Sequence, residues 1–263
     1  MSRRIIATVA ILLTLAGCDG GAPRPPFQDP DGWQAKLATA DPARGAALYA
    51  QMHRLSGERE ALSCATCHGP QGGGNYGLEN PKHIAPRLAG LNTVYVGEQL
   101  RAYANGTRVF PPMQALAGKL SSQDVADLAV NVAQLDPGPA PLQTLTPALV
   151  ERGRVVWTEG VVGAATPCAQ CHGKAGEGKV LRSPAIAGEP FPYIVAQLTT
   201  MHDRGRTGTT AADTMSAAVG RLRDDDLVAV AAYVASLQAR EVGESRPANA
   251  PAAPTEKPNR GGV

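Results

Sequence analysis

The chain has 263 residues, of which 43% are hydrophobic and 18% charged, a composition typical of a soluble globular protein and too polar for one with many membrane spans. Its length allows one large domain or two of about a hundred residues each. The formal net charge is only +2 and no basic stripe with interleaved aromatic residues occurs, so no nucleic-acid partner is expected. Aromatic residues make up 4%, which would leave two small cores under-filled unless a large apolar cofactor completed each of them.

The first eighteen residues, 1–18, have the features of an export signal. Arg3 and Arg4 precede an apolar run at 5–15 that is too short to span a bilayer. The sequence LAGC that ends at Cys18 resembles the lipobox of bacterial lipoproteins, in which the cysteine becomes the acylated first residue of the mature protein. An ordinary signal peptide cleaved nearby is the alternative. We predict lipidation of Cys18, and hence a protein tethered to a bacterial membrane.

Three stretches of biased composition divide the rest of the chain. Residues 19–40, rich in Pro, Gly and Asp, predict a flexible tether, and residues 240–263 predict a disordered tail. The proline-rich segment 136–146 cannot sustain a helix and is predicted to be a linker. These boundaries leave two domains of similar length, residues 41–135 and 147–239.

Both halves follow one plan. Each opens with a helix that has a proline in its first turn, Pro42 or Pro147, and continues with a CxxCH unit and a glycine-rich loop. A segment APRLAG or SPAIAG, a helix beginning with tyrosine, and a final amphipathic helix with acidic residues in its first turn complete the repeat. No convincing strand pattern occurs, so the sequence predicts an all-helical tandem repeat. The matched pairs are Gly45 and Gly153, Tyr49 and Trp157, Pro86 and Pro184, Gly90 and Gly188, Tyr95 and Tyr193, and Gln99 and Gln197.

The CxxCH units at 64–68 and 168–172 are compatible with four chemistries. A structural zinc site needs four ligands, and no third and fourth ligand recur at matched positions. A redox-active dithiol would be expected within a βαβ pattern, and a disulfide inside the unit would close a tiny loop and contribute little. The repeated unit therefore favours covalent c-type haem, with both thiols bound to the haem vinyl groups and the histidine bound to iron. The residues concerned are Cys64, Cys67 and His68, and Cys168, Cys171 and His172.

The sixth position of each iron decides what such a haem can do. A vacant position would allow ligand binding and chemistry, whereas a methionine thioether gives a high-potential electron carrier. Met113 and Met215 occupy matching places, each seven residues before a leucine where the last helix begins. We predict these two as axial ligands. The remaining candidates have no counterpart in the other half and are expected to be packing or surface residues: Met52, Met201, His53, His83 and His202.

The chain resembles the dihaem class I cytochromes c, and among them the kind called cytochrome c4, over about residues 41–239. The resemblance rests on CATCHG and CAQCHG, on APRLAG and SPAIAG, on the YxxxQL helices and on the methionines before the last helices. It implies an all-α fold of two tandem cytochrome c domains, each wrapped around a covalent haem. It also implies that the backbone carbonyls of Pro86 and Pro184 accept the imidazole N–H of the two haem-ligating histidines.

The resemblance further implies how the helices of each domain pack. In this family the first and last helices cross at a glycine and an aromatic residue. The second half offers Gly153 and Tyr233, but the first half has Asn131 where the tyrosine would match, so its crossing is less well predicted.

The function implied is that of a periplasmic, membrane-anchored electron carrier and not of an enzyme. Its donor and acceptor would be redox proteins, respiratory membrane complexes among them, and no small-molecule substrate is expected. Two alternatives stay open. One is an electron-transfer subunit of a membrane dehydrogenase or oxidase complex. The other is a redox enzyme, a dihaem peroxidase or a thiosulfate-oxidising cytochrome, which would need an open, histidine-bound or cysteine-bound sixth position; with Cys18 in the signal, no cysteine remains for the latter.

Overall fold

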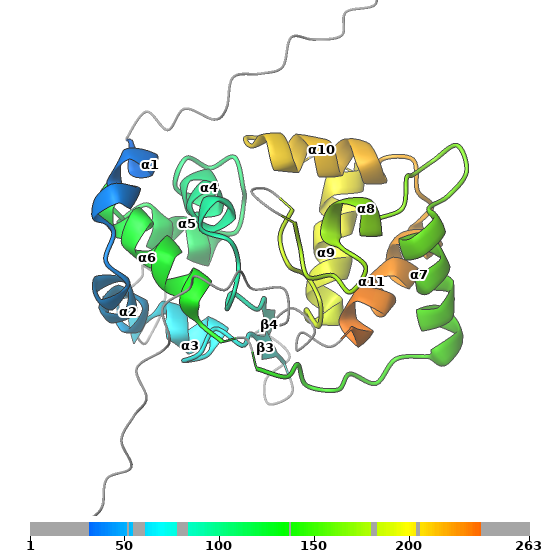
Figure 1. Ribbon diagram of the computed structural model, residues 1–263, viewed down its shortest axis with the longest axis horizontal. Helices are drawn as coiled ribbons and strands as arrows, with labels where there is room; N and C mark the ends of the chain where they lie inside the picture. The colour runs from blue at the N-terminus through cyan, green and yellow to red at the C-terminus, as the bar shows by residue number, and fades with distance from the viewer. Residues whose placement is uncertain are drawn as a thin grey trace, which may run out of the picture.

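The computed structural model describes residues 32–51, 53–54, 61–77, 84–136, 138–179, 183–203 and 206–237. The described chain forms two lobes that lie side by side, and each consists mainly of helices (Figure 1). The first lobe contains α1 (Trp33–Lys36), η1 (Leu37–Thr39), α2 (Pro42–Ala50), α3 (Cys64–His68), α4 (Thr93–Ala104), α5 (Pro111–Ala117) and α6 (Ser122–Gln134). The second contains α7 (Pro147–Glu159), α8 (Ala169–His172), α9 (Phe191–Asp203), α10 (Thr210–Val219) and α11 (Asp224–Ser236). None of the described helices is long and apolar enough to cross a membrane.

Two short antiparallel ladders accompany the helices of the first lobe. β1 (His53–Arg54) pairs with β2 (Ala61–Leu62), and β3 (Asn75–Tyr76) pairs with β4 (Ile84–Ala85). The sequence predicted no strand, because a pair of residues is too short to show an alternating pattern. The ladders leave the prediction of an all-helical fold intact, since each strand has only two residues.

The first helix of each repeat begins at the proline that the sequence singled out. α2 begins at Pro42, with the carboxylate of Asp41 as its N-cap, and α7 begins at Pro147. Proline is favoured there because a first-turn N–H has no partner within the helix. The last helix of the first lobe, α6, is preceded by a capping box in which Ser121 and Asp124 each accept a backbone N–H of the other.

The first and last helices of each lobe cross at a glycine. A Cβ added to Gly45 of α2 would lie under 3.0 Å from the carbonyl oxygen of Asp127 in α6. A Cβ added to Gly153 of α7 would likewise collide with a carbonyl oxygen of α11. The adjacent side chain is Asn131 in the first lobe and Tyr233 in the second. The close approach therefore exists in both lobes, although the aromatic residue occurs in one.

The first domain begins earlier than the sequence predicted. Helices α1 and η1 fall within residues 19–40, which the composition assigned to a flexible tether. Trp33 is 0% exposed, and its ring lies over Gly97 of α4, where an added Cβ would collide with it. The assignment of residues 33–40 to the tether is therefore wrong, because an indole in this polar stretch completes the core of the first lobe.

The segment that joins the lobes lies against the second one. The side-chain amide of Gln143 donates to the carbonyls of Glu189 at 3.0 Å and Ala235 at 3.1 Å. Its side-chain oxygen accepts the N–H of Phe191 at 2.7 Å. A single glutamine thus attaches the linker both to the start of α9 and to the end of α11.

Candidate haem sites and the interface between them

The CxxCH unit of the first lobe forms α3. The hydroxyl of Ser63 accepts the N–H of Thr66 at 3.1 Å, and the hydroxyl of Thr66 accepts the N–H of Ser63 at 3.0 Å. This capping box fixes where α3 begins. The helix ends at Gly69, whose φ of 78° is the conformation that glycine adopts without strain. Both cysteines and the histidine therefore lie within one short helix.

The matched unit of the second lobe begins at Cys168 and continues through α8 to Gly173, whose φ is 83°. The loop that follows each unit is held by the matched aromatic residue of the first helix. Tyr49 donates its hydroxyl to the carbonyl of Gly69 at 2.8 Å, and Trp157 donates its indole N–H to the carbonyl of Lys174 at 3.1 Å. The two lobes thus position their CxxCH units by the same means.

Both histidines are buried and orient their rings through the prolines named from the resemblance. Nδ1 of His68 lies 2.9 Å from the carbonyl oxygen of Pro86, and Nδ1 of His172 lies 3.0 Å from that of Pro184. Since a carbonyl only accepts, Nδ1 carries the proton in each ring. Burial lowers the pKa of both histidines, although the carbonyl bonds act against it. Each ring is therefore neutral, and its Nε2 has a free lone pair.

None of the four described cysteines forms a disulfide. Burial raises the pKa of Cys64 to about 11 and that of Cys168 to about 11. Within the part of the chain that the structure describes, no three His, Cys, Asp or Glu side chains gather as metal ligands. The geometry therefore gives no support to the zinc or the disulfide alternative.

Met215 is the methionine that approaches a CxxCH histidine. Its Sδ atom lies 3.5 Å from Nε2 of His172, the ring nitrogen opposite the one bonded to Pro184. Met215 is on α10, and Met113 occupies the corresponding helix α5 of the first lobe, where it is half-buried. The fold therefore presents both methionines on the helix that precedes the last helix of their lobe.

The other candidate ligands have different surroundings. Met201 is buried in an apolar cluster with Val219, Leu222 and Leu227, as expected for a packing residue. His202 places Nδ1 at 2.7 Å from the carboxylate of its neighbour Asp203, and this hydrogen bond raises the pKa of His202. His53 lies in β1. Cys18, Met52 and His83 lie outside the described residues.

Two arginines that the sequence analysis missed join the lobes. Arg108 and Arg206 are each 7% exposed. Arg108 donates to Gln99 of its own lobe at 2.9 Å and to Gln197 of the other at 2.9 Å. Arg206 donates to Gln197 at 3.1 Å and to Gln99. This crossed network could have been found from the sequence, because both arginines and both glutamines stand at the same offset of 98 residues.

The crossed network also fits a haem in each lobe. Its acceptors are uncharged amide oxygens, together with the hydroxyl of Tyr193 at 3.1 Å from Arg108. Two buried guanidinium groups favour negative charge nearby; Glu189 lies within electrostatic range of Arg108, and the two propionate carboxylates of each haem c would add to it. The described residues thus supply cysteines outside disulfides, neutral imidazoles and buried cations, a set that fits two covalent haems.

A second set of contacts joins the lobes close to Pro86. The hydroxyl of Tyr76 donates to the carbonyl of Gly188, and the backbone N–H of Arg87 donates to a carboxylate oxygen of Glu189 at 3.0 Å. Glu189 is only 4% exposed, and burial raises its pKa to about 8. No pattern in the sequence marks this glutamate, because its counterpart in the first half is Leu91.

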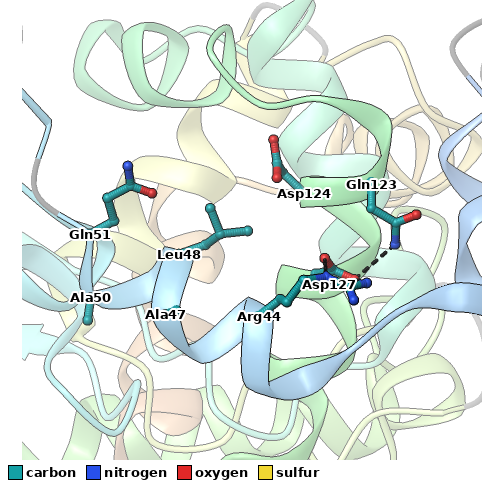
Figure 2. Close-up of a pocket in the computed structure, with 8 residues that line it drawn as sticks. All are labelled: Arg44, Ala47, Leu48, Ala50, Gln51, Gln123, Asp124 and Asp127. Atoms are coloured by element: carbon teal, nitrogen blue, oxygen red, sulfur yellow. Dashed lines mark hydrogen bonds and ion pairs between the residues drawn. The ribbon is translucent and has the colours of Figure 1, made fainter.

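A surface groove between α2 and α6 is separate from both CxxCH units (Figure 2). Asp127 accepts hydrogen bonds there from Arg44 at 2.8 Å and from Gln123 at 2.9 Å. None of the predicted haem ligands lines this groove. Its lining residues are Arg44, Ala47, Leu48, Ala50, Gln51, Gln123, Asp124 and Asp127.

Comparisons with known proteins match both lobes to c-type cytochromes. The family described as "Cytochrome c" matches residues 42–136, and "Cytochrome C oxidase, cbb3-type, subunit III" matches residues 155–234. The chain is 34% identical to a thiosulfate dehydrogenase electron acceptor of Thiomonas intermedia, an alignment that covers 67% of this chain and 79% of that protein. It is 28% identical to cytochrome c4 of Pseudomonas aeruginosa, over 69% of this chain and 87% of that protein.

Solved structures show the same likeness. Reduced cytochrome c4 from Pseudomonas stutzeri matches with a TM-score of 0.61 and 25% identity, over 75% of this chain and 99% of that chain. A thiosulfate dehydrogenase from Marichromatium purpuratum matches with a TM-score of 0.62 and 32% identity, over 75% of this chain but 40% of that chain. The prediction of two tandem cytochrome c domains is thereby confirmed. The chain belongs to the dihaem class I cytochromes c, with cytochrome c4 among its relatives, and it carries two covalently bound haem c groups.

Proposed function

We propose that this protein is a periplasmic electron carrier in which each haem iron is held by a histidine and a methionine. The observation that supports this most strongly is the 3.5 Å approach of Met215 Sδ to Nε2 of His172. When bound, each haem supplies a one-electron iron couple. In the first lobe the proposed pair is His68 and Met113.

The residues of the chain hold and tune these groups. The carbonyls of Pro86 and Pro184 fix the imidazole rings and increase their basicity, because each accepts the Nδ1–H. As an iron ligand, the thioether of Met113 or Met215 would favour ferrous iron and raise the potential. It would also take the coordination position that a substrate would need. This arrangement suits transfer of electrons and not catalysis.

The names of the relatives suggest the partners. Two of them are thiosulfate dehydrogenase electron acceptors, of which the one from Thiomonas intermedia is 34% identical. We infer that the present protein accepts electrons from a periplasmic dehydrogenase and passes them to a respiratory membrane complex. A second candidate function is that of a stable subunit of an oxidase complex. The match of residues 155–234 to an oxidase subunit favours it.

Exchange of the methionine ligands tests the proposed ligation. Met215→His should lower the potential of one haem and leave the other nearly unchanged, because imidazole stabilises ferric iron more than a thioether does. Met113→His should lower the other potential. Both are measured by spectroelectrochemical titration of the holoprotein, with Met201→Leu as the control that changes neither. If both methionine variants kept the parent potentials and the parent spectrum, the proposed ligation would be wrong.

The proposed membrane anchor rests on the LAGC sequence that ends at Cys18. A bacterial lipoprotein carries several acyl chains, which suffice for stable binding where a single chain is marginal. The protein made in its bacterial host should therefore sediment with membranes and be released by detergent. Cys18→Ser should be soluble or remain unprocessed. Equal partitioning of the parent and the variant would identify an ordinary signal peptide.

A further inference from the structure

The peptide group between Pro86 and Arg87 is hydrogen-bonded at both ends. Its carbonyl oxygen accepts Nδ1–H of His68 at 2.9 Å, and its N–H donates to Oε2 of Glu189 at 3.0 Å. The two ends of a peptide are conjugated, so negative charge at the N–H increases the electron density on the carbonyl oxygen. One peptide group therefore connects a carboxylate of the second lobe to the imidazole of the first.

Glu189 is held in a buried and charged environment. Its backbone carbonyl accepts a hydrogen bond from the linker residue Gln143, and the guanidinium groups of Arg87 and Arg108 lie within electrostatic range of its side chain. The phenols of Tyr76 and Tyr193 also lie within electrostatic range of it. Burial raises the pKa of Glu189 to about 8, while the two arginines act in the opposite direction. Both protonation states of the carboxyl group are therefore reached under mild conditions.

Among the residues that the structure describes, no equivalent of this connection leads to His172. The repeat aligns Gly90 with Gly188, which places Leu91 at the position of Glu189. Leucine carries no hydrogen-bond acceptor, so it cannot accept the N–H that follows Pro184. The two haem sites are alike in their predicted ligands and differ in this contact from the opposite lobe.

We propose that Glu189 is a positioning residue that sets the potential of the haem held by His68, acting across the domain interface through the 86–87 peptide. The inference rests on the proposed function, because it takes His68 as the iron ligand. An ionised Glu189 strengthens the bond from His68 to Pro86 and makes the imidazole a stronger donor. A stronger donor stabilises ferric iron and lowers the potential. A protonated Glu189 lowers the potential less than the ionised form does.

The potential of the first haem should fall as pH rises. As pH rises through the pKa of Glu189, the carboxyl group loses its proton and the potential of the first haem falls. Reduction of that haem in turn favours protonation of Glu189, because the iron becomes less positive. The potential of the second haem should not share this step.

Titration of the holoprotein over a range from about pH 6 to about pH 10 tests the proposal. Glu189→Gln keeps the shape and an acceptor oxygen but removes the charge. Its first-haem potential should match the parent at the acidic end, exceed it at the alkaline end and lose the step between them. Glu189→Leu, which copies Leu91, should raise this potential at every pH. The two potentials are assigned to their haems with Met113→His and Met215→His.

A matched control separates this contact from the general effect of charge. Glu177 is another carboxylate of the second lobe, and it accepts the N–H of Ala175 at 2.8 Å within its own loop. Glu177→Gln should leave the first-haem potential unchanged. An unchanged first-haem potential in Glu189→Gln at every pH would overturn the proposal.

A separate measurement tests whether Glu189 acts on His68 through the 86–87 peptide group. In the reduced, diamagnetic protein, the Nδ1–H proton resonance of His68 should move upfield in Glu189→Gln, while that of His172 stays in place. A changed potential with an unmoved His68 resonance would show that Glu189 acts directly through space, which would contradict the peptide route. Absence of the methionine-to-iron absorption band from the oxidised parent protein would instead contradict the proposed ligation, so the two failures are distinguishable.

Discussion

At the scale of single residues, Met215 and Met201 show how two methionines of one lobe differ in their contacts. Met215 directs its sulfur toward Nε2 of His172 at 3.5 Å. Met201 is 9% exposed and packs with Val219 and Leu227. Met215 also packs against this cluster, so its contact with His172 is what distinguishes the proposed ligand from a side chain that fills space in the core.

Truncation of each methionine separates these roles. Met215→Ala should open the sixth position of the second haem, so the reduced variant should bind carbon monoxide and show a changed Soret band. Met201→Ala should bind none, but it should lose about 2–5 kcal/mol of unfolding free energy through a core cavity. If Met201→Ala bound carbon monoxide and Met215→Ala did not, Met201 would be the iron ligand and Met215 the packing residue.

The site residues that the sequence predicts are those with local patterns. His68 and His172 follow their cysteines directly, and the two methionines recur at matching places in the repeat. Glu189 was missed because its importance depends on a peptide group about a hundred residues away in the chain. Nothing in the residues around it marks such a partner, and the repeat even places an apolar residue in the matching position.

At the scale of helices and strands, the glycine crossings determine how closely the first and last helices pack. Gly153→Ala would push a Cβ into the backbone of α11, which cannot yield as a flexible side chain would. We expect a loss of about 1–3 kcal/mol or more in the free energy of unfolding, from overpacking. Denaturant unfolding of the holoprotein, followed by haem absorbance, measures this loss.

Gly73→Ala is the matched control for this substitution. Gly73 has open space around its Cβ position and no positive φ, so the variant should unfold within about 0.5 kcal/mol of the parent. Equal stability of Gly153→Ala and Gly73→Ala would show that the helices of the second lobe can separate at no cost.

The longer elements could be predicted and the shortest could not. Helices α6 and α11 have thirteen residues each, enough to display apolar residues at helical spacing. Helix α1 has four residues and therefore shows no period, and composition alone assigned it to the tether. Its presence depends on burial of Trp33 against α4, a tertiary contact that composition does not reveal.

At the scale of the whole molecule, the repeat predicts the number of domains but not how they meet. The arrangement depends on polar pairs that cross between the lobes. Each of Arg108 and Arg206 donates to a glutamine of both lobes, and Glu189 accepts from the backbone of Arg87. The linker adds Gln143, which ties the start of α9 to the end of α11. Such directional contacts define one orientation more narrowly than apolar packing would.

The burial of Trp33 bears on the proposed lipid anchor at Cys18, because it shows where the first domain begins. With an acylated Cys18 as its anchor, the first domain begins after residues 19–32 and not after residues 19–40. A fully extended chain covers at most about 3.3–3.6 Å per residue, so the reach falls from about 75 Å to about 50 Å. Under the proposed anchoring, the first domain would stay within this distance of the bilayer, near partners embedded in the same membrane. An electron donor that moves freely through the periplasm would have to come to this layer.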